Sequence, residues 1–441
     1  MIVMKFGGSS LESAYKIRRC IQIVKGELNR RPLVVVSAHG AMTDCLVHTA
    51  QKALAGQDGA AEFKRFHLTL LDSLRLERGL VDDLLAQLET ILHGVSLIRE
   101  LSPKTLDHIL SFGERCSSVI IAAAAARSGL PAVACNAYDI GFLTDSAFGC
   151  AAPLAGIGEE IARRLAEIDG APIITGFIGQ DRDGNLTTIG RNGSDYTASF
   201  IGAAVEAEEI QIWTDVDGVM TVDPSLDPSA RNLPVLSFQE ASELAYYGAE
   251  VIHSGSLIPA VAKNIPIRVA NTAKPEEPGT IILPQPALAD RIAKSVVYKE
   301  DVCLITIASP RLMSASRLLT AALDCLTSRR IGIHIAATSV ASVSFVTDQT
   351  YDSDRLEAAA RELEALGAIS LEEDKAIVCV VGEELKGRIG VLGRIFTALG
   401  AEGIKARLVS QSASEINVAF LVDNSQIKAA VIALHRLLLE E

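Results

Sequence analysis

The sequence lacks most features that would suit a secreted, membrane-spanning or nucleic-acid-binding protein. Its eight cysteines are scattered without a C-x-x-C pair, which argues against a zinc cage or a disulfide framework and fits buried thiols in a reducing cytosol. The longest apolar run near the middle, 119–126, falls far short of the roughly 20 residues that cross a bilayer. Positive charge is scarce, because 41 Lys and Arg stand against 54 Asp and Glu and the net charge is −13. We therefore expect a cytoplasmic protein that binds neither nucleic acid nor membranes.

Two common phosphate-binding motifs are also missing. The sequence contains no G-x-x-x-x-G-K-[ST] loop and no H-R-D set of the protein-kinase type. Residues 1–8 form a short apolar run that stops at glycines, which is typical of a strand and not of a signal peptide. Any phosphate chemistry must therefore use a different kind of loop.

The composition is that of an ordinary globular protein. The chain has 441 residues, 49 % hydrophobic and 22 % charged, enough for about three folding units. Apolar runs at 2–6 and 33–37 flank a helical stretch at 13–28, which is the βαβ rhythm of a helix-covered sheet, and 60–110 predicts a helical insertion. Further strand-like runs at 132–135, 172–177, 210–214 and 266–269 predict an α/β core that reaches to about residue 285.

The last third of the sequence repeats itself. Beyond residue 300, short strand-like and helical segments alternate as βαββαβ, twice, and 339–348 aligns with 414–423. The repeat predicts two ferredoxin-like units at 301–441, joined to the core by a linker at 286–300. Periodicity alone leaves a regulatory role and a structural or dimerising role about equally open.

The first strand ends in a group of residues suited to phosphate. Lys5 closes the strand, and Gly7, Gly8 and Ser9 form the turn into the next helix. Phosphate oxygens need backbone N–H groups that can be approached without a Cβ, a helix N-terminus and a positive charge, and this segment supplies all three. Taken alone, the segment is also an ordinary tight turn between a strand and a helix.

A second glycine loop, at 187–197, adds charged residues. Arg191 could bind a carboxylate, and Asp195 stands at the start of a helical run. The alternatives are an N-cap role for Asp195 and a surface ion pair for Arg191. The third strand-like run, 210–214, is followed by polar groups at its carboxyl end, where open α/β sheets hold their ligands.

Five motifs in register resemble the ordered motif series of aspartate kinases. The tail at 412–418 is similar to the paired ACT domains of that family, so the resemblance covers essentially the whole chain. The wider amino-acid kinase family shares the first glycine loop, but the arginine-containing loop together with the ACT tail favours the aspartate branch. The motifs are K-F-G-G-S-S at 5–10, S-F-G-E-R-C-S-S at 111–118, T-G-F-I-G at 175–179, T-I-G-R-N-G-S-D-Y-T-A at 188–198 and W-T-D-V-D-G-V-M-T-V-D-P at 213–224.

The resemblance implies an architecture and an activity. The fold would be α/β, an amino-acid-kinase-like open sheet sandwiched by helices at 1–285, with an aspartate-binding lobe at about 1–168 and a nucleotide-binding lobe at about 169–285. Two regulatory ferredoxin-like ACT domains would follow. The enzyme would transfer the γ-phosphoryl group of ATP, with Mg²⁺, to the side-chain carboxylate of L-aspartate, a first step toward lysine, threonine and methionine. An amino-acid effector at the ACT domains and a homodimer or higher homo-oligomer are further expectations.

The chemistry of this reaction is mainly positioning and charge. The acceptor carboxylate, with a reference pKa of about 3.9, is ionised at neutral pH and needs no general base. Two anions must meet, and at about 4 Å with an effective dielectric of about 20 each pair of unit charges costs roughly 4 kcal/mol unless it is offset. By resemblance, Lys5, Mg²⁺ and the N–H groups of Gly7 and Gly8 would provide the offset.

The resemblance also carries residue roles onto matching positions. Arg191 would grip a substrate carboxylate as a bidentate fork, Glu114 would pair with the substrate ammonium, and Asp195 would hold Lys5 and the substrate in line. On sequence alone, Glu114 is more simply a charge on a helix surface. No residue is assigned as a metal ligand. The expected site residues are Lys5 and Asp195 for catalysis, Ser37, Thr43, Glu114 and Arg191 for aspartate, and Gly7, Gly8, Ser9, Thr214, Asp215 and Gly218 for the nucleotide.

Several positions depart from the family pattern. Met220 and Ser225 stand where Tyr and Arg are common, and Glu250 stands where a nucleotide-side lysine is frequent. His334 and Val340 occupy places where lysine-sensitive relatives tend to carry acids. Two other functions therefore stay open: an amino-acid kinase with a glutamate-type acceptor, and a non-catalytic ACT amino-acid sensor with a decayed kinase core.

Glu250→Lys tests the effect of the unusual carboxylate. A lysine would restore a cation where one usually meets the nucleotide, so we expect the KM for ATP to fall while the KM for aspartate stays constant. Steady-state kinetics with varied ATP measure this, and an unchanged KM for ATP would discard the idea.

Overall fold

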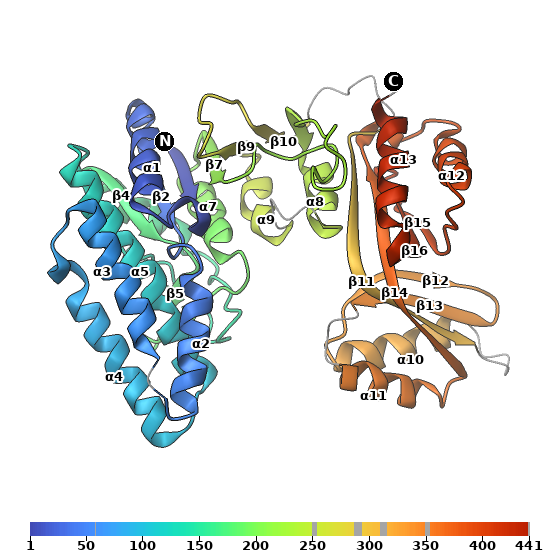
Figure 1. The fold of residues 1–441 in the computed structure, drawn as a ribbon, viewed down its shortest axis with the longest axis horizontal. Helices are drawn as coiled ribbons and strands as arrows, with labels where there is room; N and C mark the ends of the chain where they lie inside the picture. Colours follow the sequence, from blue (N-terminus) through green and yellow to red (C-terminus); the bar gives the residue numbers. More distant parts are fainter. Residues whose placement is uncertain (58, 249–253, 286–292, 309–314, 349–352, 440–441) are drawn as a thin grey trace. The chain divides into compact units, whose positions relative to one another are not determined.

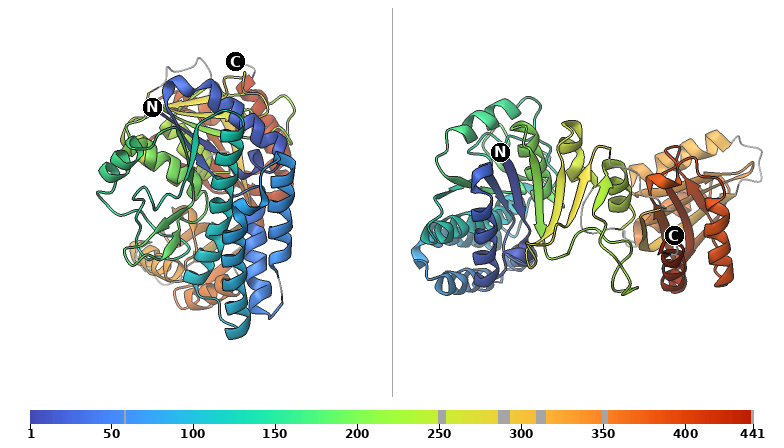
Figure 2. Two further views of the ribbon diagram at one scale, coloured as in Figure 1. Left: turned by 90° about the vertical axis from the view of Figure 1, so that its left-hand side faces the viewer. Right: turned by 90° about the horizontal axis from the view of Figure 1, so that it is seen from above.

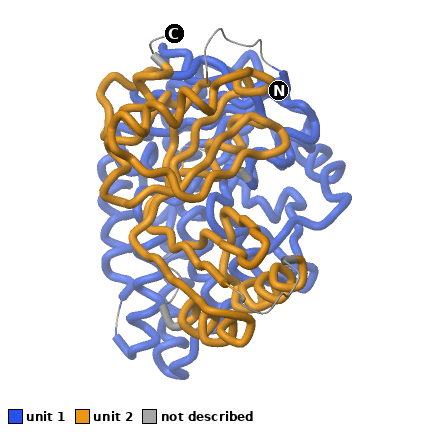
Figure 3. The backbone as a smooth tube through the Cα atoms, turned by 90° about the vertical axis from the view of Figure 1, so that its right-hand side faces the viewer, with its two compact units in different colours: residues 1–219, 232–238, 251–286 blue, residues 220–231, 239–250, 287–441 orange. Residues whose placement is uncertain are grey.

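The computed structural model describes the chain apart from residues 58, 249–253, 286–292, 309–314, 349–352 and 440–441 (Figure 1). It divides into two compact units, coloured separately in Figure 3. The expected catalytic domain at 1–285 differs from unit 1 in two places, because 220–231 and 239–250 pack with the C-terminal unit. Unit 1 comprises 1–219, 232–238 and 251–286, and unit 2 comprises 220–231, 239–250 and 287–441.

An eight-stranded sheet forms the centre of unit 1, in the order β3-β4-β2-β1-β7-β9-β10-β8. Its pairings are parallel except for that of β9 with β10. The strands β1, β2 and β4 are wholly buried and mainly apolar, as expected for a sheet covered by helices on both faces. The strands are β1 (Ile2–Phe6), β2 (Pro32–Val36), β3 (Ala132–Cys135), β4 (Ala171–Thr175), β7 (Glu209–Thr214), β8 (Val235–Ser237), β9 (Ile267–Asn271) and β10 (Thr280–Leu283).

Helices cover this sheet on two sides, as the two turned views show (Figure 2). Ile2, Met4 and Phe6 of β1 share one core with α1 to α5, while Lys5 points to the other side, since successive side chains of a strand alternate. The insertion expected at 60–110 is thus confirmed as helical. The helices of unit 1 are α1 (Ala14–Gly26), α2 (Met42–Leu54), α3 (Ala60–Leu74), α4 (Asp82–Ile98), α5 (Pro103–Arg127), α6 (Gly158–Ala166), α7 (Gly193–Ala204) and α9 (Ser254–Ala262). Helix α8 (Phe238–Tyr246) belongs to unit 2 except for its first residue.

Helix α5 is the longest helix of unit 1 among the described residues. Ser102 caps it by accepting a hydrogen bond from the N–H of Thr105 at 3.2 Å, and Pro103 occupies its first turn, where a missing N–H does no harm. By length and composition alone it could cross a membrane, but 78 % of its most apolar stretch is buried inside the protein. It is therefore a core helix in this fold.

Several short elements were not expected from the sequence. A two-stranded hairpin, β5 (Ile178–Gln180) with β6 (Leu186–Thr188), precedes α7 and is too short for a periodic signal. Short 3₁₀ turns also occur, at Gly8–Ser10, Leu28–Arg30, Arg78–Val81, Glu383–Leu385 and Asn424–Gln426.

Unit 2 is built on one antiparallel six-stranded sheet, in the order β12-β13-β11-β14-β16-β15. The helices α10 and α11 pack on one half of the sheet, and α12 and α13 on the other, each with its own core. The elements are β11 (Ser295–Ala308), α10 (Ala315–Ser328), β12 (Ile333–Thr338), β13 (Ser342–Asp348), α11 (Ser353–Leu363), β14 (Ala368–Val381), α12 (Val391–Ala401), β15 (Val409–Gln411), β16 (Asn417–Asp423) and α13 (Ile427–Leu439).

The two ferredoxin-like halves are interleaved and do not simply follow one another. Residues 295–299 of β11 pair with the second half of β14, and Val296 belongs to the core of α12 and α13. Residues 302–308 of the same strand pair with β13 in the other half. The expected linker at 286–300 is therefore strand from Ser295 onward. A register shift between Lys299 and Val302 interrupts the alternation there, which is why the sequence pattern indicated a strand only from residue 302.

Candidate active site

The central strand of unit 1 ends in a buried ion pair. Lys5 is 8 % exposed, and its Nζ lies 2.6 Å from Oδ1 of Asp195 in the first turn of α7. The N-cap position of α7 is taken by Asn192, so the alternative N-cap role of Asp195 is wrong. The two expected catalytic residues are thus in contact, although 190 positions separate them in the sequence (195 − 5 = 190).

The register of the sheet brings three of the expected segments to one edge. Phe6 pairs with Val36 of β2 on one side and with Trp213 of β7 on the other. Gly7 and Ser37 therefore follow β1 and β2 directly, and Thr214 is the last residue of β7, so all three lie at the carboxyl edge of the sheet. Open α/β sheets bind their ligands at this edge.

The glycine turn after β1 is fixed by its neighbours. The N–H of Gly7 donates to the carbonyl of Trp213 at 3.1 Å, so this donor is already used. A Cβ at Gly8 would lie 2.8 Å from the carbonyl oxygen of Ala38, so the close approach of a neighbouring loop requires glycine there. Within the described part of the chain, the N–H groups of Gly8 and Ser9, which begin the 3₁₀ turn, have no partner in the backbone. The Gly7 N–H, which was expected to contact phosphate, is therefore already bonded, whereas those of Gly8 and Ser9 have no backbone partner among the described residues.

Glu114 is buried and is not a surface charge. One carboxylate oxygen accepts a hydrogen bond from the N–H of Ala38 at 3.0 Å, and the other has no partner among the described residues. Burial raises the pKa of the Glu114 carboxyl to about 8. The bond to Ala38 fixes the loop after β2, next to Ser37. Thr43, also expected to contact aspartate, is half-buried in the first turn of α2, just beyond this loop.

Arg191 is exposed on the loop that leads into α7. Among the described residues it forms no ion pair with a carboxylate, so the surface ion pair is not observed. It stands four positions before Asp195, whose contact with Lys5 brings this loop to the end of the central strand. Arg191 thus lies on the loop that reaches the ion pair, and its guanidinium has no carboxylate partner among the described residues.

Asp107 fixes the start of the same loop and was not found from the sequence. Its carboxylate, 1 % exposed as a residue, accepts from the N–H of Thr188 at 2.8 Å, the hydroxyl of Thr188 at 2.8 Å and the N–H of Gly149 at 2.9 Å. The sequence around Asp107 forms no recognisable motif, and its hydrogen-bond partners lie 42 and 81 positions away, so the sequence analysis did not identify it. It acts on the site only by holding the backbone of the loop.

His39 is a second missed residue. Its ring is fully buried and its Nδ1 lies 2.8 Å from the carbonyl oxygen of Leu11, which can only accept, so Nδ1 carries the proton. Burial lowers the pKa of His39 to about 3 and that of the adjacent His67 to about 4, so both rings are neutral at pH 7. His39 thereby ties the loop after β2 to the segment after the glycine turn.

The residues after β7 form the other side of the edge. Thr214 is half-buried and its carbonyl accepts from the N–H of Thr272 at 2.8 Å, while Asp215 is exposed. Gly218 has φ of +121°, and a Cβ there would lie 2.4 Å from Nδ2 of Asn232, so this glycine shapes the turn. Glu250 lies outside the described residues, and Met220 and Ser225 belong to unit 2.

The side chains present fit a metal ion that arrives with a nucleotide. In the described parts of the chain, no group of three or more His, Cys, Asp or Glu could hold a metal ion. Mg²⁺ in phosphoryl-transfer sites is usually held by one or two carboxylates together with phosphate oxygens. Asp215, exposed at the end of β7, is a carboxylate in such a position.

The site combines an open sheet with a lysine–aspartate pair and glycine turns at its carboxyl edge. This combination is typical of a class of phosphoryl-transferring enzymes, and comparison with known proteins indicates the same class. The model of the amino acid kinase family matches residues 1–271, and that of an ACT domain matches 378–438. The chain belongs to the amino acid kinase family, in its aspartokinase branch.

Individual relatives match over nearly the whole chain. Aspartokinase 1, chloroplastic, of Arabidopsis thaliana is 34 % identical, over 98 % of this chain and 79 % of the relative. Lysine-sensitive aspartokinase 3 of Escherichia coli is 29 % identical, over 100 % and 99 %. The crystal structure of E. coli aspartokinase III in complex with aspartate and ADP matches with a TM-score of 0.86 at 29 % identity, over 100 % of both chains.

The raised pKa of Glu114 predicts a pH-dependent stability. Because the native state keeps this proton up to a pH of about 8 and the unfolded state loses it near its ordinary value, stability should fall as the pH rises between these values. Glu114→Gln keeps an acceptor for Ala38 and removes the ionisation. In the absence of substrate, we expect the free energy of unfolding of this variant to exceed that of the parent protein by a few kcal/mol at pH 8 to 9. The reason is that a pKa shift of one unit corresponds to about 1.4 kcal/mol.

Unfolding temperatures of Glu114→Gln and of the parent protein, measured from pH 5 to 9, should form two curves that diverge as the pH rises. Glu77→Gln, at an exposed carboxylate, is the control and should follow the parent protein. Parallel curves for Glu114→Gln and the parent protein would show that Glu114 is ionised in the native state.

Proposed function

We propose that the protein is an aspartate kinase, which transfers the γ-phosphoryl group of ATP to the side-chain carboxylate of L-aspartate and forms 4-phospho-L-aspartate. The observation that carries this proposal is the buried pair of Lys5 and Asp195 at the carboxyl edge of the sheet, between the glycine turn and the Arg191 loop. The relative from E. coli that was crystallised with aspartate and ADP supports the choice of substrates.

The reaction needs positive charge between two anions. Lys5 supplies an ammonium at the end of β1, next to the free N–H groups of Gly8 and Ser9. Asp195 is not required as a base, because the acceptor carboxylate is already ionised. Its part is to hold the Lys5 ammonium at 2.6 Å in a buried place, where an unpaired charge is costly. Mg²⁺ bound with ATP adds charge on the phosphate side.

The amino acid is oriented by two groups of opposite sign. Arg191, free and exposed, offers a bidentate fork to a carboxylate. Glu114 offers the oxygen that has no partner, and an ammonium there would favour its ionised form. A substrate with one ammonium and two carboxylates fits this arrangement. Glutamate has the same charges and one more methylene, so it remains the second candidate acceptor.

The regulatory expectations are part of the same proposal. The ACT match and a relative crystallised with lysine and aspartate support an amino-acid effector in unit 2. We extend the proposal to a homodimer or higher homo-oligomer, a cytoplasmic location and a role in the biosynthesis of aspartate-derived amino acids.

A hydroxamate assay for acyl phosphate tests the activity. With ATP and Mg²⁺, we expect product with aspartate and little with glutamate or without acceptor. Lys5→Met and Arg191→Lys should each lower kcat/KM for aspartate by about 100-fold or more, because the first removes the ammonium and the second keeps the charge but loses the bidentate fork. Arg182→Lys, at an exposed arginine in the turn between β5 and β6, should leave it unchanged. Turnover with glutamate alone would favour the other amino-acid kinase, and no turnover with any acceptor would favour the non-catalytic sensor.

Lysine sensitivity is the second test. The Asp348 carboxylate is already engaged, with His334 Nε2 at 2.8 Å and Lys299 Nζ at 3.0 Å from the same oxygen. Because that oxygen already has two cationic partners, a lysine ε-ammonium would compete with His334 and Lys299 for it, and we expect weak or absent inhibition by lysine alone. Initial rates with increasing lysine at fixed aspartate measure this. Half-maximal inhibition at micromolar lysine would refute the expectation.

A further inference from the structure

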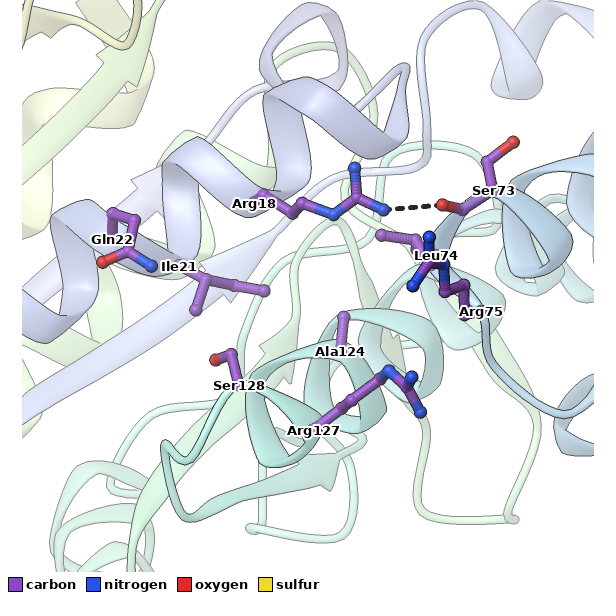
Figure 4. A pocket seen from close by; sticks show the side chains of 9 residues that line it. All are labelled: Arg18, Ile21, Gln22, Ser73, Leu74, Arg75, Ala124, Arg127 and Ser128. Atoms are coloured by element: carbon purple, nitrogen blue, oxygen red, sulfur yellow. Dashed lines mark hydrogen bonds between the residues drawn. The ribbon is translucent and has the colours of Figure 1, made fainter.

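A cavity of about 620 Å³ lies on unit 1, between the helices α1, α3 and α5 (Figure 4). Three arginines line it, one from each helix or helix end: Arg18, Arg75 and Arg127. The remaining lining residues are neutral: Ile21, Gln22, Ser73, Leu74, Ala124 and Ser128. A lining with three positive and no negative side chains is unusual in a chain whose net charge is −13.

The cavity is separate from the candidate active site. Glu114 and Arg127 both belong to α5, and 13 residues separate them (127 − 114 = 13), which is about 20 Å at 1.5 Å per residue. The cavity lies near the C-terminal ends of α3 and α5, whereas the site residues of α5 lie in its first half. None of the lining residues was assigned a role in phosphoryl transfer.

Part of this positive charge has an ordinary structural use. Cations near a helix C-terminus stabilise it, and Arg18 donates to the carbonyl of Ser73 at 2.6 Å, at the end of α3. The carbonyl of Ser128, after the end of α5, is bonded at 2.5 Å by Lys25. The hydrogen-bond donors to these two carbonyls are therefore Arg18 and Lys25, and not the side chains of Arg75 and Arg127.

In the described part of the chain, the side chains of Arg75 and Arg127 do not bond to helix C-terminal carbonyls. Neither guanidinium is in an ion pair or side-chain hydrogen bond there, and the nearby carboxylate of Asp72 is paired with Arg78. In Figure 4 their side chains extend into the space between the helices, on the same side as that of Arg18. Like charges that share a cavity repel one another, and a bound anion would remove that repulsion.

We propose that this cavity is a binding site for a small multivalent oxyanion, a phosphate ester or a polycarboxylate. Guanidinium groups bind both kinds of anion through paired N–H donors. The volume lies within the usual range for small-molecule sites, and Ile21, Leu74 and Ala124 offer an apolar surface to the carbon part of such a ligand. Gln22 adds an amide that can donate or accept.

Titration calorimetry of the full chain at low ionic strength tests the site, with inorganic pyrophosphate and citrate as probes. ADP is kept at saturation so that the nucleotide site does not contribute. We expect one site per chain for at least one probe, and the preferred probe distinguishes phosphate from carboxylate ligands. Arg75→Gln/Arg127→Gln should weaken this binding at least about tenfold, the effect of losing a charged hydrogen bond.

The matched control is Arg65→Gln, at an exposed arginine of α3 that does not line the cavity, and it should bind as the parent protein does. If the double variant unfolds, Arg127→Lys replaces it; it keeps the charge, loses the fork and should bind more weakly than the parent protein. Absence of binding by both probes, equal binding by the double variant, or equal loss in Arg65→Gln would overturn the proposal. A changed sedimentation coefficient of the double variant without binding of either probe would also overturn it, in favour of an acidic protein surface as the partner.

Discussion

The site depends on a positive charge at the end of a buried strand. β1 lies in the middle of the sheet, and its side chains alternate between two helical layers, so Lys5 points into the interior beside α7. A buried ammonium needs a partner, and Asp195 supplies it. This one contact places the first turn of α7 at the end of β1. The glycine turn follows β1 directly and the Arg191 loop leads directly into α7, so both lie at the same edge of the sheet.

The fold was predictable where long apolar runs carry the signal. β1 and β3 were expected with the same bounds that the structure shows, since each is a short, mainly apolar run with clear ends. The hairpin β5–β6 has only three residues on each strand, too few for periodicity. β11 was expected seven residues too late, because its register shift falls among the charged residues 299–301. The local sequence pattern therefore does not predict the bounds of a strand that pairs in both halves of a sheet and changes register between them.

The site was predictable only where residues belong to motifs. Lys5, Arg191 and Asp195 stand in glycine loops that resemblance could assign, and Glu114 needed the resemblance because a lone carboxylate in a helix is usually exposed. Asp107 and His39 gave no signal, since their partners, backbone groups and for Asp107 also the Thr188 hydroxyl, are far away in the sequence. Such residues become visible only when the backbone that they bind is known.

Asp107 and His39, together with Glu114, explain how the edge of the sheet holds its loops. Each loop is fastened by a buried side chain: the loop after β2 by Glu114, the start of the Arg191 loop by Asp107, and the segment after the glycine turn by His39. Glu114 and Asp107 come from the same helix, α5, whose first half thus fixes two loops of the candidate site. Such preorganisation matters for a reaction whose nucleophile is already ionised, because correct placement of charge is then the main contribution left to the protein. The long core helix is therefore as much a part of the site as the glycine turns are.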